Sequence, residues 1–300
     1  MAYAQPSSPQ SIGGVIDDGI RLFCSAFSRC WLLAILPGLV LALYELAFPV
    51  SVPIFDALKQ PSLLLSIGDS RRLMAMDLLS SLLTLVFQGA VVVRQIAITR
   101  DDSTCTFGRA LAKSVRRLPG LILGMILYVL AFVGGTMLLA AVGVVIAAFV
   151  PGLLATMRGH LWAALLLSIP LLIVALLLSV RLQLWTVALF AEDTSAKGAL
   201  VSSWRLTKGH WWRAGTILTV ALIMILVLVL CFSVAGGAVA AFGRFDTTGR
   251  TALVYLFSLA ASSIYYPLGA AIWLAMYHDF KLRREGGDLE TRVGALSGTT

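Results

Sequence analysis

Six apolar stretches, each close to the length that crosses a lipid bilayer, constrain this chain more than any other feature. A spanning helix needs about 20 mainly apolar residues, and continuous apolar runs do not show the period of two expected for barrel strands. Short basic segments separate the stretches. They are Trp31–Pro49, Leu73–Val93, Leu121–Val150, Leu161–Val180 with an apolar extension to Ala191, Thr216–Phe242 and Ala252–Tyr277.

The composition agrees with a membrane location. Apolar residues make up 59 % of the chain and charged residues 13 %, against roughly 25 % charged residues in soluble domains. We therefore predict an all-α fold, a polytopic transmembrane helical bundle of about six spanning helices. The third and fifth stretches exceed the bilayer thickness, so we expect them to tilt or to break at Gly134–Gly135 and Gly236–Gly237.

The distribution of Lys and Arg predicts the orientation. The net charge of +8 would fit nucleic acid, but the basic residues lie in clusters between apolar stretches, which is typical of membrane topology. Seventeen of the 23 basic residues fall on one side of the predicted bundle. That side is cytoplasmic by the positive-inside tendency, so both termini are expected in the cytoplasm. The six on the other side are Lys59, Arg71, Arg72, Arg158, Arg244 and Arg250.

A moderately polar helical stretch precedes each odd-numbered span: Ser11–Cys30, Thr106–Leu118 and Ala196–Trp212. Each is too charged to span, and its apolar residues recur at helical spacing, which indicates an interfacial amphipathic helix on the cytoplasmic side. The three stretches align at offsets of 95 and 89 residues, and acidic residues follow each even-numbered span. Two interpretations stay open: a threefold repeat of helix plus hairpin, or a chance likeness among short basic helices.

These patterns define the predicted domains. Residues 1–10 form a disordered N-terminus, residues 11–283 a single transmembrane domain, and residues 284–300 a polar C-terminal tail. If the repeat is real, its units are residues 11–102, 106–193 and 196–283.

Charged and aromatic residues near the span ends are the candidate functional positions. Arg181 either sits deep in the fourth span, as an ion pair or an anion contact, or extends to the inner headgroups as an anchor together with Arg94; we favour anchoring. Glu45 and Asp77 either face a polar cavity or pair with Arg71 or Arg72, or they are interfacial carboxylates, which we favour. The candidate lipid or anion contacts are Arg181, Arg94, Arg116, Arg205, Trp211, Trp212 and Arg213.

Chemistry of other kinds is not predicted. The three histidines and four cysteines show no metal-ligand spacing, and no phosphate-binding or nucleophile motif occurs in the sequence. We therefore predict a protein that is not an enzyme and has neither a cofactor nor a metal site. The spacing in Gly120-x-x-x-Gly124 favours close packing between helices.

Two segments resemble a known family. Ala199–Arg213, preceded by Glu192-Asp193, and the ending Tyr277–Glu290 are similar to the bacterial six-span proteins named for the membrane domain of glycerophosphoryl diester phosphodiesterase. The first half of the chain matches mainly through hydropathy and Ser11–Arg21. His278 and Gly287 depart from the family pattern. The resemblance implies a membrane module without the soluble phosphodiesterase domain of some members, and hence without its activity.

Together these observations predict a non-enzymatic integral membrane module of a bacterial cytoplasmic membrane, which assists or scaffolds an envelope or lipid-related process. Its expected partners are anionic headgroups on the cytoplasmic side and a second membrane protein, and nucleic acid is not among them. The alternative is a transporter or channel for a lipid or small solute, with Arg181 as an anion contact in a cavity between the hairpins.

Overall fold

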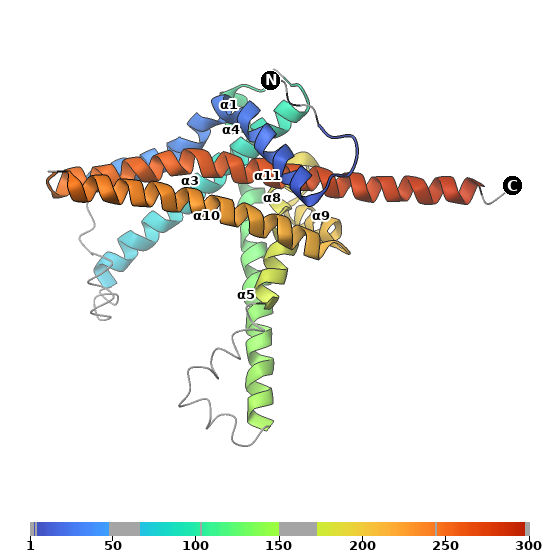
Figure 1. The fold of residues 1–300 in the computed structure, drawn as a ribbon. Coiled ribbons are helices and arrows are strands. Elements are labelled where there is room, and N and C mark those ends of the chain that lie inside the picture. Colours follow the sequence, from blue (N-terminus) through green and yellow to red (C-terminus); the bar gives the residue numbers. More distant parts are fainter. Residues whose placement is uncertain are drawn as a thin grey trace. The chain divides into compact units, whose positions relative to one another are not determined.

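The structure is a computed structural model that describes Tyr3 and residues 5–47, 67–102, 104–149, 173–243 and 245–297. The regular structure of these residues is entirely helical (Figure 1). Residues 173–182 are helical as well. The other helices are α1 (Ile12–Ala47), α3 (Ile67–Thr99), α4 (Phe107–Arg116), α5 (Leu118–Phe149), α8 (Trp185–Ala191), α9 (Ala196–Thr207), α10 (Trp211–Phe242) and α11 (Thr247–Ser297).

Within the described residues, six helical segments are long and apolar enough to cross a membrane, which confirms the predicted fold class. Residues 161–172 of the fourth predicted span lie outside the described part of the chain. The six segments are Ile12–Val40, Leu78–Thr99, Leu118–Leu138, Ile173–Ala191, Trp211–Phe242 and Ala252–Arg284.

Helix breaks considered at three places in the sequence do not occur in the described helices. The polar stretch Ser11–Cys30 and the span after it form one continuous helix, α1, because no glycine or proline separates Arg29 from Trp31. α5 and α10 run unbroken through their glycine pairs. Intrahelical hydrogen bonds have no competitor in hydrocarbon, so a glycine pair alone does not end a spanning helix.

The chain packs as two compact units assembled from distant segments. Unit 1 consists of Met1–Gln5, Asp17–Leu118 and Ala221–Leu274. Unit 2 consists of Pro6–Ile16, Pro119–Val220 and Ala275–Thr300. The N-terminal parts of α1 and α10 and the C-terminal part of α11 therefore belong to unit 2, and the rest of these helices to unit 1.

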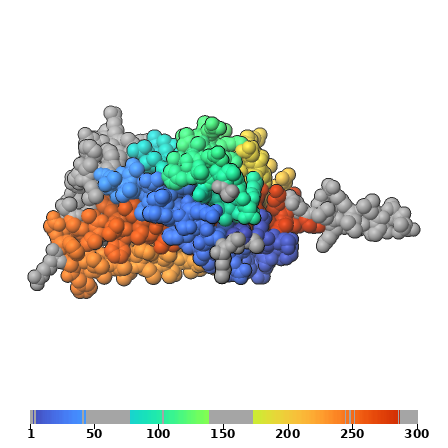
Figure 2. Space-filling model, turned by 90° about the horizontal axis from the view of Figure 1, so that it is seen from above, coloured from blue at the N-terminus to red at the C-terminus, as the bar shows by residue number. Residues whose placement is uncertain are grey.

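In unit 1, α1 runs antiparallel to α11 through close contacts at two glycines. A Cβ atom on Gly19 would lie 2.9 Å from Ile272, and one on Gly38 would lie 2.7 Å from Leu259. Figure 2 shows α1 in blue beside the orange part of α11. The fully buried Gln95 of α3 donates a hydrogen bond to the carbonyl oxygen of Pro267 at 2.8 Å, which joins α3 to α11.

In unit 2, α5 packs against the end of the fourth span. A Cβ on Gly124 would come within 2.4 Å of the Trp185 ring, whereas one on Gly120 would make an ordinary contact of 3.8 Å with Leu189. Gly124 thus serves the close packing that the Gly120-x-x-x-Gly124 spacing predicted.

The three polar stretches begin with the same local structure. The side-chain hydroxyls of Ser11, Thr106 and Ser195 each accept a hydrogen bond from the backbone N–H three residues later. This is the usual N-cap interaction, and these residues stand at the offsets of 95 and 89 found in the sequence. The spans before α4 and α9 are each followed by an aspartate with positive φ, Asp101 and Asp193. These features favour the repeat, which stays a prediction for the complete units.

Candidate functional site

The seven predicted contact residues divide between the units. Unit 1 holds Arg94 and Arg116, and unit 2 holds Arg181, Arg205, Trp211, Trp212 and Arg213. Those of unit 2 lie on or beside α9, the start of α10 and the segment before α8. Unit 2 is therefore where the structure places most of the predicted residues.

The most connected polar group in unit 2 is the carboxylate of Asp279 in α11, which is only 3 % exposed. Its Oδ2 accepts hydrogen bonds from Nε and Nη2 of Arg213, at 3.1 and 3.0 Å, and from Nε of Arg283 at 3.0 Å. Its Oδ1 accepts one from the backbone N–H of Gln10 at 2.8 Å. A buried carboxylate is stable only with such a complete set of partners.

Gln10 closes this cluster from the other side. Its carbonyl oxygen accepts hydrogen bonds from Nη2 of both Arg213 and Arg283. The two guanidinium groups thus share the same two acceptors, and the cluster contains two positive charges against one negative charge. The predicted disorder of residues 1–10 does not extend to Gln10, because both of its backbone polar groups are bonded here.

A second polar group fixes α9. The carboxylate of Glu192 accepts hydrogen bonds from the Ser202 hydroxyl at 2.7 Å and from the Tyr277 hydroxyl at 3.0 Å. The Ser203 hydroxyl donates to the carbonyl oxygen of Arg181 at 2.8 Å. Both serines are buried. The buried face of α9 is therefore hydrogen-bonded to the rest of unit 2, and the opposite face of the helix is exposed.

Arg181 stacks on an aromatic ring. Its guanidinium carbon lies 4.5 Å from the centre of the Trp204 ring, a cation–π geometry. Arg181 lies near the end of the helical residues 173–182, and a turn at Gln183 and Leu184 separates these residues from α8. Arg181 makes no ion pair among the described residues, which favours anchoring over the buried ion pair.

The outward face of this region combines aromatic and basic side chains. Trp212 is 73 % exposed, and Trp204 and Trp211 are exposed as well. Exposed basic residues of α9 and the following turn, Arg205 and Lys208, lie among them in sequence. Amphipathic rings beside cations are typical of the headgroup level of a membrane, where one side of the ring is apolar and the other is wet.

The two candidates in unit 1 differ from one another. Arg116 is exposed on the amphipathic helix α4. The Nε and Nη1 atoms of Arg94 are buried and have no hydrogen-bond partner within the described residues. Arg94 lies close enough to Cys105 to act on its thiol: burial raises the pKa of that thiol, and the Arg94 charge acts against this rise. The side chains of Glu45 and Asp77 lie outside the described part.

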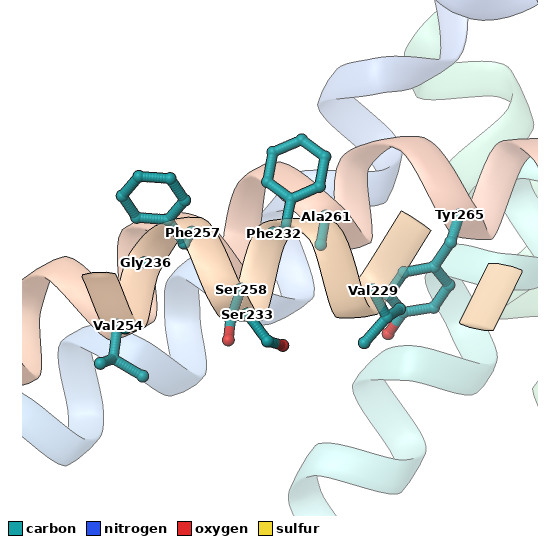
Figure 3. Close-up of a pocket in the computed structure, with 10 residues that line it drawn as sticks. Val229, Phe232, Ser233, Gly236, Val254, Phe257, Ser258, Ala261 and Tyr265 are labelled. Atoms are coloured by element: carbon teal, nitrogen blue, oxygen red, sulfur yellow. The ribbon is translucent and has the colours of Figure 1, made fainter. Parts of the chain in front are cut away.

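Unit 1 also contains a groove of about 330 Å³ between α10 and α11 (Figure 3). The Ser233 and Ser258 side chains point to one side of the helix pair, and Phe232 and Phe257 point to the other. Within the described part of the chain, neither Ser233 nor Ser258 bonds back to its own helix, whereas Ser262 in the same α11 does. The groove thus offers hydroxyl groups within an apolar lining.

Sequence patterns do not identify the residues that hold the cluster together. Asp279 and Glu192 stand out only as acidic residues after even-numbered spans, Tyr277 and Arg283 stand out only as members of the segment Tyr277–Glu290, and nothing in the sequence distinguishes Gln10. One general signal is present, since a carboxylate at a predominantly basic membrane face needs a partner. Among the described residues, no group of three or more His, Cys, Asp and Glu could hold a metal ion.

One family model matches the chain, over residues 73–280, and its description is a domain of unknown function, DUF7847. No curated protein and no solved structure shows a significant match. The resemblance to the phosphodiesterase membrane domain therefore stays a prediction. The match covers the spans after the first, apart from the last residues of the sixth, and includes Asp279; on this ground the chain belongs to the DUF7847 family.

Proposed function

We propose that this multi-pass membrane protein is a non-enzymatic module of a bacterial cytoplasmic membrane that binds anionic lipid headgroups and assists or scaffolds an envelope or lipid-related process. The basic ends of its helices then face the cytoplasm, and a second membrane protein is its expected partner. One observation carries the proposal: the outward surface of α9 and the start of α10, where exposed tryptophans accompany exposed cations.

The charges of this surface are available to lipid. The Asp279 carboxylate is enclosed by Arg213, Arg283 and Gln10, so it does not neutralise Arg205 or Lys208. Each basic residue near an anionic membrane surface contributes about 1 kcal/mol to the attraction. The small residues on the inner face, Ser202 and Ser203, are buried, so the helix can keep its basic and aromatic residues in the headgroup layer.

In unit 1, α4 likewise buries small residues on one face and exposes basic residues on the other. Its inner face buries Ala110 and Ser114, and the Ser114 hydroxyl donates to the carbonyl oxygen of Val86 at 2.6 Å. Arg109, Lys113 and Arg116 are exposed. Two short helices that bury small residues and expose basic ones support a function at the headgroup layer.

The test uses two exposed arginines that differ in predicted location. The full-length protein is placed in nanodiscs of mixed phosphatidylglycerol and phosphatidylcholine, and the lipids retained on release are measured by mass spectrometry. Arg205→Gln is expected to lower phosphatidylglycerol enrichment about fivefold, the effect of roughly 1 kcal/mol, and Arg250→Gln to leave it unchanged. Equal effects of the two substitutions, or no enrichment in the parent protein, would contradict the proposal.

A second function, transport of a lipid or small solute, is favoured by the groove between α10 and α11. Its serine hydroxyls could bond a polar group of a molecule passing through the apolar lining. Arg181 does not line this groove. Gly237 does line it, and a Cβ atom added there would meet no other atom within 4 Å, so Gly237→Leu would fill the groove without a clash at the backbone.

Transport can be followed in proteoliposomes that contain a fluorescent phospholipid, with dithionite quenching as the readout. Transport predicts fast exchange between leaflets for the parent protein and slow exchange for Gly237→Leu. Exchange no faster than in protein-free vesicles would exclude transport of this lipid and leave the headgroup-binding proposal standing.

A further inference from the structure

We propose that Arg213 and Arg283 together form a binding site for a single phosphate group, carried by a lipid headgroup or by a small soluble phosphate. This inference rests on the proposed function and gives it a defined site. The binding chemistry is that of two guanidinium groups that lie side by side on α10 and α11 of unit 2 and share two acceptors.

The two guanidinium groups are already held in place on one edge. Asp279 accepts from Nε of both, and the Gln10 carbonyl accepts from Nη2 of both. Arginine side chains lose considerable rotational freedom when a ligand immobilises them. Here this loss has already occurred on folding, so a phosphate would bind with a smaller entropic penalty than at two free surface arginines.

The other edge of each guanidinium remains available. The Nη1 atoms of Arg213 and Arg283 have no hydrogen-bond partner among the described residues, and neither belongs to the buried polar atoms without a partner. The side chains are 17 % and 26 % exposed. The Nη1 groups can therefore donate to an oxygen that approaches from outside, and phosphate oxygens accept such charge-assisted bonds well.

The local charge selects an anion. The cluster keeps one net positive charge, because the single Asp279 carboxylate faces two arginines. Arg213 lies in the first turn of α10, where the helix dipole adds positive potential. Arg284 adds a further cation next to Arg283, with its Nη1 on the Arg205 carbonyl. A cation or an uncharged ligand would gain nothing from this field.

The position of the cluster fits a group at headgroup depth. The highly exposed Trp212 directly precedes Arg213, at the start of a span. Tryptophan at a span end marks the membrane interface, where lipid phosphates lie. The structure thus places the free edges of the arginines where either a lipid phosphate or a cytoplasmic phosphate could reach them.

The experiment measures binding to the full-length protein in a neutral detergent by titration calorimetry. The probes are a short-chain phosphatidylglycerol and inorganic phosphate, which separate the two sources. Arg283→Gln is expected to weaken the binding of at least one probe about tenfold, the loss that one charge-assisted hydrogen bond represents. Arg250→Gln is the matched control and should bind both probes like the parent protein.

The outcomes separate this inference from the proposed function. If Arg283→Gln binds both probes as tightly as the parent protein, the site is overturned, even where nanodiscs show lipid enrichment through the wider basic surface. If only inorganic phosphate binds, and Arg283→Gln weakens it, the site takes a soluble phosphate and not a lipid, and the nanodisc measurement alone decides the headgroup function. If short-chain phosphatidylglycerol binds and Arg283→Gln weakens it, the site takes a lipid phosphate.

A second variant covers the case in which Arg283→Gln does not fold. Arg283→Lys keeps the charge and the bond to Asp279 but removes the planar fork that reaches two acceptors and the ligand at once. It is expected to melt close to the parent protein and to bind the phosphate probe more weakly. Unchanged binding by a folded Arg283→Lys variant would overturn the site.

Discussion

The hydroxyl of Ser203 donates a hydrogen bond to the main-chain carbonyl of Arg181 at 2.8 Å and so ties α9 to the spanning segment before it. The equivalent residue in the preceding polar stretch is Ser114, whose hydroxyl donates to the carbonyl of Val86 at 2.6 Å. Both serines are completely buried. Each of these short helices is therefore bonded to its preceding span by a serine at the equivalent position.

This bond can be tested by removing the hydroxyl. We expect Ser203→Ala to destabilise the packing of α9 against the preceding span by about 1 kcal/mol, because the Arg181 carbonyl loses its hydrogen-bond donor. Hydrogen exchange should show faster exchange of the α9 amides. Ser179→Ala is the control, since its hydroxyl bonds to Ala175 in its own helix. Equal exchange of α9 in the two variants would show that the bond does not hold the helix.

The Asp279 carboxylate should be essential for the stability of unit 2. Asp279→Asn leaves two arginines facing each other without a compensating charge, which is expected to cost about 3 kcal/mol. The measurement is the thermal unfolding of the detergent-solubilised protein. Asp17→Asn breaks an exposed pair with Arg21 and should cost less than about 1 kcal/mol. A melting temperature of Asp279→Asn like that of Asp17→Asn would contradict the structural role of the cluster.

Two glycines one helical turn apart on α5 should respond differently to the same substitution. Gly124→Ala places its Cβ 2.4 Å from the Trp185 ring, and the required shift is expected to cost about 1–3 kcal/mol. Gly120→Ala makes only ordinary contact with Leu189 and improves helix propensity, so its stability should be equal or higher. Thermal unfolding of both variants checks this order, and the reverse order would refute the packing of α5 against α8.

The parts of the fold that the sequence predicts are those set by local chemistry. Span positions follow from hydropathy, and the capping residues Ser11, Thr106 and Ser195 recur at the offsets of the aligned stretches. The Asp279 cluster is not predictable in this way. Asp279 lies 66 residues from Arg213 and 269 residues from Gln10, and no local pattern tells which carboxylate two arginines will share.

The same limit applies to single residues. Arg94 and Arg181 look alike in sequence, because each lies near the predicted cytoplasmic end of an even-numbered span. In the structure Arg181 has a tryptophan to stack on, while Arg94 has buried donors without a partner among the described residues. Trp204 comes from a later helix, so the difference between the two arginines arises only through tertiary packing.

The predicted orientation can be checked with Cys105, which lies between the second span and α4. A variant that keeps Cys105 alone, with the other three cysteines replaced, should react with an impermeant maleimide only after spheroplasts are permeabilised. Arg250→Cys in a cysteine-free background should react without permeabilisation, because Arg250 is predicted on the other side. The opposite pattern would reverse the topology and place the basic helices outside.

The same variant has a characteristic pH dependence. Burial raises the pKa of the Cys105 thiol, so less of the reactive thiolate is present at neutral pH than in an ordinary cysteine. Labelling in permeabilised spheroplasts should therefore be slow at pH of about 7 and should still increase above pH of about 8.5, where a free thiol is half ionised. Removing the nearby charge with Arg94→Gln should slow labelling further, because Arg94 favours the thiolate. A rate that Arg94→Gln leaves unchanged would show that the guanidinium does not face the thiol, and the buried position of Arg94 would then need another explanation.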